Sequence, residues 1–213
     1  MIFVSFYTDD EIYKPLGENL IKQLSELNLK YDIIKLNLHQ SFTKEFWNNI
    51  VAYKPFFIKE MLEKHKESIV WIDVDTIIKK FPTFLVEMNN NSIVDISYDI
   101  RGKEQKPWLA IMFVKFDQKM IDFFQEFGTN CRNDLKENKN NKKWYEVDQP
   151  SLSKMMKQGI FDERDINFQE FPKGVIAKLK GDEKTVFVEI QSSREYRIKL
   201  GWDPKKMGWN NLV

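Results

Sequence analysis

Hydrophobic positions change their spacing several times along the chain, which predicts alternating strands and helices. Residues 2–7 form a short apolar run rich in β-branched and aromatic side chains, as in a buried strand. Leucine and isoleucine then recur at helical spacing over residues 16–27, and residues 31–38 return to strand character. The most economical arrangement is a β-α-β unit with a right-handed crossover, which belongs to an α/β fold with a mostly parallel sheet.

A proline and two acidic residues mark the next part of the pattern. The helical spacing of residues 42–66 is interrupted at Pro55, where we expect a new helix to begin because proline lacks the amide N–H needed inside a helix. This helix leads into an apolar strand over residues 68–72. Asp73 and Asp75 follow where that strand should end, and open α/β sheets bind ligands outside the carboxyl ends of their strands.

The second half of the chain predicts an antiparallel edge on the sheet. Residues 92–99 and 109–116 are strand candidates, and the charged, turn-prone segment between them forms either a hairpin or a substrate loop. The polar run at residues 133–143 is expected to be a solvated, mobile loop. The other expected elements are a helix over residues 118–127, a helix that starts at Pro150 and a strand over residues 185–190.

Composition sets limits on domain number and partners. The chain has 213 residues, of which 42% are hydrophobic, and no repeat or flexible linker divides it, so we expect a single domain over residues 1–213. A net charge of +1 favours neither nucleic acid nor a membrane surface as partner. The single cysteine, Cys131, cannot form an internal disulfide, and the N-terminus lacks a basic signal region. We therefore expect a cytoplasmic protein without a membrane span.

Asp73 and Asp75 are the strongest candidates for chemistry. Aspartate is common enough in this chain for one D-x-D to arise by chance, so the context carries the argument. Carboxylates at the end of an apolar strand are costly to bury without a partner, and a bound cation would offset that cost. On extended chain the two side chains point the same way, which favours a shared Mn²⁺ or Mg²⁺ ion. The alternative is that they cap a turn and a following helix.

Three segments together resemble a known enzyme family. They are the Tyr53-Lys54-Pro55 helix, V-W-I-D-V-D-T-I-I at residues 70–78 and D-Q-P-S-L at residues 148–152. They resemble nucleotide-sugar glycosyltransferases of the GT-A type, which include small enzymes of bacteria and of large DNA viruses such as chlorella viruses. The resemblance covers most of the chain, although only the D-x-D block is specific. It implies a Rossmann-like α/β fold and a D-x-D motif that holds Mn²⁺ or Mg²⁺ on the diphosphate of a donor, with a uridine-linked sugar as the expected donor.

The resemblance also assigns donor-binding residues. It places Phe6, Tyr7 and Thr8 at the end of the first strand, against the base and ribose, and Lys54 near the donor. Asp73 would contact both the metal and the diphosphate. Phe6 and Tyr7 could equally be core residues, since aromatic side chains in strands usually serve packing. Lys54 could instead be a solvated residue beside a structurally required proline.

Asp148 is the candidate general base. In an inverting transfer, a carboxylate takes the proton of the acceptor hydroxyl as this hydroxyl attacks the anomeric carbon. Asp148 could also serve the start of the following helix, where acidic side chains are favoured. Gln149 is expected to bind the acceptor sugar beside it. Asp95 and Asp99, at the ends of a predicted strand, compete with Asp148 for this catalytic or acceptor-binding role, and Asp99 is expected to bind the acceptor.

The C-terminal part departs from the family pattern. The resemblance places Glu189 where these enzymes usually have a histidine as third metal ligand, and Arg194 where a basic side chain contacts the diphosphate. Glu189 could instead be an exposed strand residue, and Arg194 could form a surface ion pair with Glu195. His39 and His65 show no metal-ligand spacing, so we expect neither to bind the metal.

These observations predict a metal-dependent glycosyltransferase of the hexosyltransferase type. It would transfer a sugar from a nucleoside diphosphate sugar to a hydroxyl of a glycan or glycoprotein acceptor, with inversion or retention both open. One rival is a Mg²⁺-dependent nucleotidyltransferase or phosphatase, because these enzymes also use clustered aspartates. The other is a non-catalytic nucleotide-sugar-binding module, because architecture alone does not fix activity.

Overall fold

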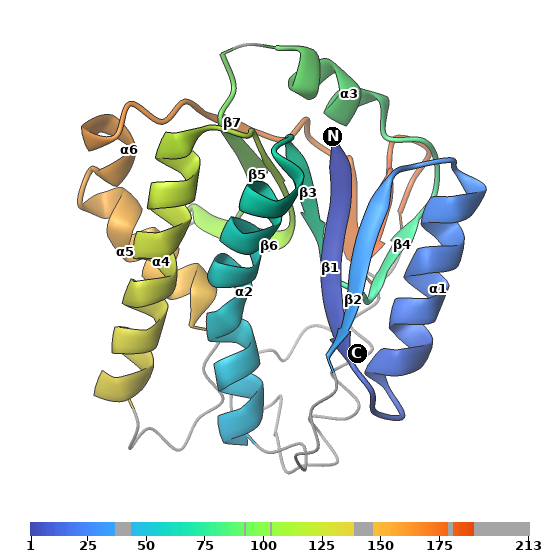
Figure 1. Cartoon of the computed structure of the whole chain (residues 1–213). Helices are drawn as coiled ribbons and strands as arrows, with labels where there is room; N and C mark the ends of the chain where they lie inside the picture. Colours follow the sequence, from blue (N-terminus) through green and yellow to red (C-terminus); the bar gives the residue numbers. More distant parts are fainter. Residues whose placement is uncertain (37–43, 92, 103, 139–146, 179–180, 190–213) are drawn as a thin grey trace.

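A six-stranded sheet forms the centre of the protein, and a three-stranded sheet lies beside it (Figure 1). This computed structural model describes residues 1–36, 44–91, 93–102, 104–138, 147–178 and 181–189. The order of the large sheet is β2 (Tyr31–Leu36), β1 (Ile2–Thr8), β3 (Ile69–Ile72), β6 (Lys106–Val114), β5 (Ile96–Arg101) and β7 (Phe168–Glu170). The order of the small sheet is β4 (Thr76–Ile78), β9 (Phe187–Glu189) and β8 (Ile176–Lys178).

The large sheet is mostly parallel, as predicted, but its antiparallel strand is not at the edge. β1 pairs in parallel with β2 and β3, and β5 pairs in parallel with β7. β6 runs antiparallel to both β3 and β5 and lies between them. The reason is the short connection after β5, which forms a hairpin and returns the chain directly beside the strand it has left. Of the two alternatives for this segment, the hairpin is therefore the correct one.

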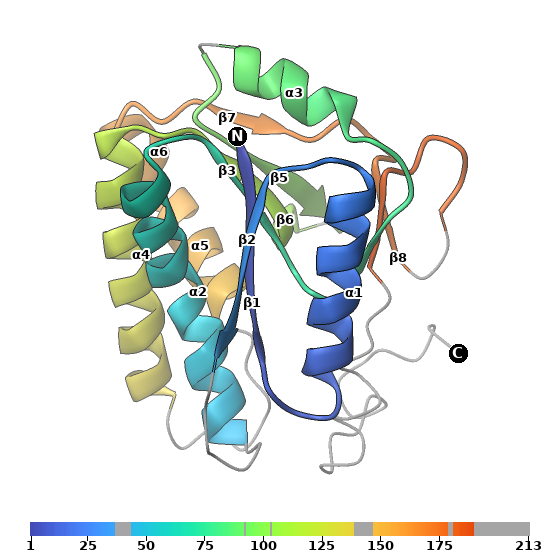
Figure 2. The same cartoon turned by 45° about the vertical axis from the view of Figure 1, so that its right-hand side comes forward.

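Helices cover both faces of the large sheet. They are α1 (Tyr13–Glu26), α2 (Lys44–His65), α3 (Thr83–Asn90), α4 (Gln118–Glu137), α5 (Asp148–Lys157) and α6 (Ile160–Glu163). Figures 1 and 2 show α1 on one side of the sheet and α2, α4 and α5 on the other, with α3 across the end where β1 begins. Within the described ranges, no helix is long and apolar enough to cross a membrane.

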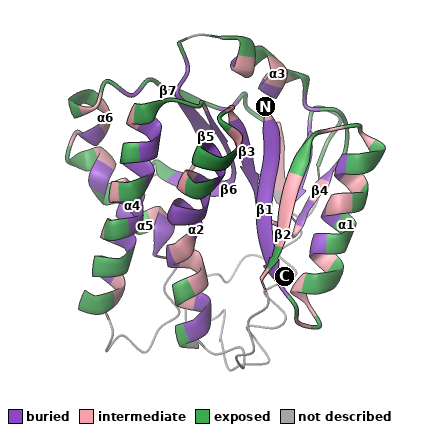
Figure 3. Cartoon of the chain, in the orientation of Figure 1, coloured by how far each residue is buried: buried purple, intermediate pink, exposed green. Residues whose placement is uncertain are grey.

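The burial of β1 explains its unbroken hydrophobic sequence. All its residues are buried, and Figure 3 shows the strand between the helical layers. Ile2, Val4 and Phe6 pack in the cluster that contains α2 and α4 side chains. Phe3 and Tyr7 pack in the other cluster, against α1. Because neighbouring residues in a strand point to opposite faces, a strand covered on both faces needs apolar side chains at every position.

Two helix boundaries differ from the sequence prediction. α2 continues through Pro55 instead of restarting there. The residues around the proline, Ala52 and Phe56 to Ile58, are buried, so their packing offsets the lost backbone hydrogen bond. α4 continues to Glu137, which makes the first part of the predicted polar loop helical. Cys131 and Asp134 are buried on this extension, so tertiary contacts stabilise it.

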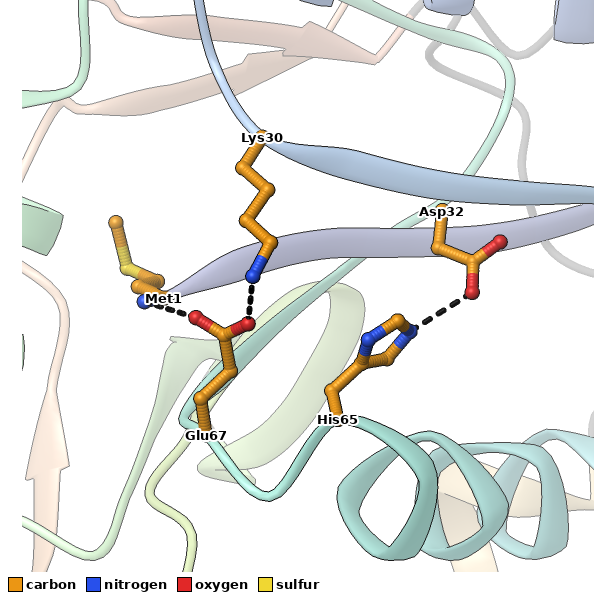
Figure 4. A network of polar contacts seen from close by, with 5 residues as sticks. All are labelled: Met1, Lys30, Asp32, His65 and Glu67. Atoms are coloured by element: carbon orange, nitrogen blue, oxygen red, sulfur yellow. Dashed lines mark hydrogen bonds and ion pairs between the residues drawn. The ribbon is translucent and has the colours of Figure 1, made fainter.

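Polar contacts connect the end of α2 to the starts of β1 and β2 (Figure 4). The Glu67 carboxylate accepts a hydrogen bond from the Met1 amino group at 2.8 Å and another from Lys30. Nε2 of His65 lies 2.7 Å from Oδ2 of Asp32. His65 therefore has a structural partner in the sheet, and the expectation that it does not bind the metal stays a prediction.

We expect Gly17→Ala to destabilise the protein. A Cβ atom at Gly17 in α1 would lie 2.3 Å from Cδ1 of Tyr7 in β1, so the ring or the helix would have to move. Overpacking of this kind costs about 1–3 kcal/mol, which exceeds the gain of about 1 kcal/mol from replacing a helical glycine by alanine. Urea denaturation measures the difference. The exposed Glu18→Ala on the same helix should stay within about 0.5 kcal/mol of the wild type. A Gly17→Ala protein as stable as this control would contradict the packing argument.

Candidate functional site

A pocket lies where β1 and β3 end and where α2 and α5 begin. Its volume is about 160 Å³, several times the space of about 30 Å³ that one water molecule takes in the liquid. It therefore has room for a group of a small-molecule ligand. Nine side chains predicted from the sequence line it: Phe6, Tyr7, Thr8, Lys54, Asp73, Asp75, Asp148, Gln149 and Glu189.

Lys54 is the central cation of this pocket. Its ammonium lies 3.2 Å from Oδ1 of Asp73 and 3.0 Å from Oδ2 of Asp148, and it donates a hydrogen bond to the Leu109 carbonyl at 3.4 Å. These three contacts match the three N–H donors of an ammonium. Lys54 is 9% exposed, which excludes the alternative of a solvated residue. It brings together carboxylates from α5 and from the end of β3.

The charges in this cluster shift each other's protonation. Burial alone would lower the pKa of Lys54, but the Asp148 and Asp73 carboxylates outweigh this effect and raise it above its usual value. Burial raises the pKa of Asp73, an effect that Lys54 opposes and the Asp148 carboxylate reinforces. Lys54 is therefore a permanent positive charge at neutral pH.

Asp73 and Asp75 lie on a turn and not on extended chain as expected. The Asp73 N–H donates to the Ala110 carbonyl at 2.7 Å, and the Thr76 N–H donates to the Asp73 carbonyl at 3.1 Å. The second bond closes the turn between β3 and β4. Both aspartates still line the pocket, and so does Val74 between them.

The two aspartates fit a divalent cation that completes its shell with phosphate oxygens. Among the described residues, Lys54 and the indole N–H of Trp71, the latter at 2.9 Å, both contact Oδ1 of Asp73, so Oδ2 is available to a ligand. Mg²⁺ is usually held by one or two carboxylates together with substrate phosphates. Among the residues that the structure describes, no three His, Cys, Asp or Glu side chains are arranged to hold an ion by themselves. A third ligand from the protein is thus not evident in those ranges.

Glu189 is buried, which contradicts the alternative of an exposed strand residue; it lines the same pocket and is held by other partners. Its Oε2 accepts a hydrogen bond from the Trp108 indole N–H at 2.9 Å and lies 3.9 Å from Nη1 of Arg101. The Arg101 guanidinium in turn lies over the Trp108 ring, 4.6 Å from its centre, and pairs with Asp99. Asp99 is not among the described residues that line the pocket, and Arg101 connects it to Glu189. A metal-ligand role for Glu189 stays a prediction.

The remaining predicted residues fall outside the pocket or outside the described ranges. Asp95 is buried away from the pocket, where it pairs with Lys119 at 2.7 Å and accepts a hydrogen bond from the Asn167 N–H at 2.9 Å. This excludes Asp95 as a rival of Asp148 within the pocket. Arg194 and His39 lie outside the described residues.

Phe6 and Tyr7 belong to the core and also line the pocket. Phe6 packs against Tyr53, Phe57 and Trp71, with ring centres 4.9–5.7 Å apart. Tyr7 is on the opposite face of the strand, against α1. Their positions are therefore compatible both with a packing role in the core and with a role in binding the base and ribose of a donor.

Three tryptophans that were not predicted line the pocket: Trp47, Trp71 and Trp108. Trp71 lies two residues before Asp73, so strand alternation could have placed it on the same side. Its indole N–H fixes Asp73, and the Lys54 ammonium lies 5.2 Å from the centre of its ring. Trp108 reaches the pocket because the pairing of β5 and β6 shifts between Tyr98 and Asp99. No signal in the sequence marks this irregularity.

Comparisons with known proteins support the fold. The sequence matches no protein family and no curated protein. The structure is similar to a glycosyltransferase involved in the glycosylation of the major capsid of PBCV-1, with a TM-score of 0.61 and 12% identity over 93% of this chain and 98% of that chain. It is also similar to the glycosyltransferase GlyE of Streptococcus pneumoniae TIGR4, with a TM-score of 0.50 and 15% identity over 81% of this chain and 45% of that chain. The chain thus has the fold of these glycosyltransferases, as the resemblance implied.

We expect Lys54→Met to destabilise the protein strongly. Methionine has an unbranched side chain of similar length but no charge, so the substitution leaves the Asp73 and Asp148 carboxylates without their shared cation. Removing one partner of a buried ion pair costs about 3–5 kcal/mol. Lys59→Met is the matched control on the same helix, because the Lys59–Glu63 pair is a solvent-accessible i,i+4 pair worth about 0.5 kcal/mol or less. Equal losses for the two variants in urea denaturation would show that the pocket cluster adds nothing to stability.

Proposed function

We propose that this protein is a glycosyltransferase that transfers a sugar from a nucleoside diphosphate sugar to a hydroxyl of a glycan or glycoprotein acceptor. The observation that carries the proposal is the convergence of Lys54, Asp73, Asp75 and Asp148 in one pocket at the carboxyl ends of β1 and β3. Ligands of α/β sheets bind in this position. The similarity to two glycosyltransferases over most of the chain supports the same conclusion.

Asp73 and Asp75 are proposed to hold Mn²⁺ or Mg²⁺. A bound ion would act as a Lewis acid on the diphosphate, where negative charge grows as the glycosidic bond breaks. The electrostatics of the pocket favour this assignment. Its described lining residues include four carboxylates and one ammonium, so an anionic diphosphate needs a cation between itself and these acids.

The end of β1 is proposed to bind the nucleoside. Phe6, Tyr7 and Thr8 line the pocket there, and an aromatic wall suits the flat face of a base. A uridine-linked hexose is the donor that the sequence resemblance favours. Lys54 would act indirectly, because its ammonium already contacts Asp73, Asp148 and a carbonyl. It would keep the two carboxylates at a fixed separation as the donor binds.

Asp148 and Gln149 are proposed to face the transferred sugar and the acceptor. Asp148 is the first residue of α5 and is 2% exposed, and both its oxygens have a contact, Oδ2 with Lys54 and Oδ1 with the Gln149 N–H. These contacts fix the carboxylate without using all its lone pairs. In an inverting transfer it would take the acceptor proton, whereas in a retaining transfer it would bind sugar hydroxyls.

We expect Asp75→Ala to abolish most donor binding and transfer. Losing one electrostatic contact in an active site typically lowers the rate by about 100-fold or more. Isothermal titration with uridine diphosphate, with Mn²⁺ or with EDTA, measures binding, and release of the nucleoside diphosphate from its sugar measures turnover. Asp32→Ala is the control, since Asp32 pairs with Lys64 and His65 outside the pocket.

The same measurements separate the rival functions. Binding of a nucleotide sugar without turnover, across a panel of acceptors, would identify a non-catalytic module. Consumption of a nucleoside triphosphate with release of pyrophosphate would identify a nucleotidyltransferase. Uridine diphosphate binding that is equal in Mn²⁺ and in EDTA would remove the metal from the proposal.

We expect Asp148→Asn to lower kcat by about 10²- to 10⁴-fold if the carboxylate acts as the base, the range usual for such groups. Donor Kd should change little, because Asp73 and Asp75 are intact. Proton NMR of the first product formed shows whether the anomeric configuration is inverted. A retained configuration, or an unchanged kcat, would assign Asp148 to sugar binding instead of proton transfer.

A further inference from the structure

A second polar cluster lies between α4 and α5, where Asp134 and Ser151 are buried and Lys154 is exposed. Asp134 of α4 is 6% exposed and accepts a hydrogen bond from the hydroxyl of Ser151 of α5, which is 1% exposed. Lys154, one turn further along α5, lies 3.3 Å from the other oxygen of Asp134. Asp134, Ser151 and Lys154 do not line the pocket, so none of these groups forms its wall.

The cluster is connected to Asp148 through the first turn of α5. Ser151 follows Asp148 by three residues, a spacing that places both side chains on one side of the helix. The contact with Asp134 therefore acts on the same helical turn that carries Asp148 and Gln149 into the pocket. A carboxylate is an expensive way to pack two helices together, because apolar side chains would fill the space without a desolvation cost. The carboxylate adds a directional hydrogen bond, which fixes the rotation of α5 about its axis and its position along that axis.

Helix α4 also packs against α2, the helix that carries Lys54. A Cβ atom at Gly128 of α4 would lie 2.6 Å from the Phe56 ring, so α2 approaches α4 very closely at this point. The guanidinium of Arg132, also on α4, lies over the Phe56 ring at 3.9 Å from its centre. α4 thus touches both elements whose side chains form the Lys54–Asp148 ion pair. It is the common support of two pocket groups that lie far apart in the sequence.

We propose that Asp134 is a positioning residue, which sets the place of Asp148 against Lys54 through its hydrogen bond with Ser151. The expected effect on kcat rests on the proposed function, whereas the expected effect on the position of Asp148 does not. Asp134 does not touch substrate. It holds the start of α5 so that the Asp148 carboxylate stays 3.0 Å from the Lys54 ammonium.

Asp95 offers a matched comparison. It too is a buried carboxylate that contacts α4, through Lys119, and it too joins two elements by accepting the Asn167 N–H. It differs from Asp134 in having no contact with α5. If buried carboxylates at α4 only stabilise the fold, removing either one should have the same effect on activity after correction for stability.

The test compares four variants of the full chain. Asp134→Ala and Ser151→Ala remove the two ends of the hydrogen bond, and Ser151→Ala serves if Asp134→Ala does not fold. Asp134→Asn retains an oxygen that accepts the Ser151 hydroxyl. Asp95→Ala is the control. We expect kcat to fall about tenfold or more in the first two, the scale seen when a supporting contact of an active site is removed, with donor Kd unchanged. Asp134→Asn should recover most of kcat, and Asp95→Ala should lose stability without losing kcat.

A crystal structure of Ser151→Ala provides the second readout. Separation of the Lys54 and Asp148 side chains beyond hydrogen-bond distance supports the proposal, and an unchanged 3.0 Å contact overturns it. An equal loss of kcat in Asp95→Ala and Asp134→Ala also overturns it. Absence of transfer by the wild-type protein would refute the proposed function alone, because the structural readout still decides the role of Asp134.

Discussion

One buried ammonium holds the pocket together. Lys54 reaches from the middle of α2 to a carboxylate at the end of β3 and another at the start of α5. These elements belong to distant parts of the sequence, and the ion pairs are their meeting point. In a partly desolvated pocket, one cation between two anions lowers repulsion that would otherwise push the two segments apart. The arrangement of acidic side chains at the carboxyl ends of the strands therefore depends on this lysine.

The two sides of the pocket are stabilised by different kinds of interaction. The half made by β1, β3 and α2 has a dense aromatic core, in which Phe6, Phe57 and Trp71 contact one another and Trp71 fixes Asp73. The other half, made by β6 and β9, uses polar contacts among Trp108, Glu189 and Arg101. The two sides of the pocket therefore depend on different interactions, aromatic packing on one side and hydrogen bonds and ion pairs on the other.

Much of the fold and part of the site could be predicted from the sequence, because both depend on local patterns. The apolar run of β1 and the position of Asp73 after β3 follow from strand burial and from the topology of α/β sheets. Three features could not be predicted, because tertiary contacts determine them. α2 continues past Pro55 through packing, β6 enters the sheet between β3 and β5, and Lys54 pairs with a residue of a remote helix. The roles of Glu189 and Arg194 depend on the C-terminal part of the chain, most of which lies beyond the described ranges.

The reversed direction of β6 has a consequence for how such a protein can diversify. Because β6 runs against its neighbours, the chain turns from β5 into β6 on the side of the sheet where the parallel strands end, close to Trp108. Hairpin connections tolerate insertions and substitutions well, since they disturb few buried contacts. Insertions or substitutions in this hairpin would reshape one rim of the pocket and leave the side formed by α2 and β3 intact. The topology thus allows one rim of the pocket to change while the side formed by α2 and β3 stays the same.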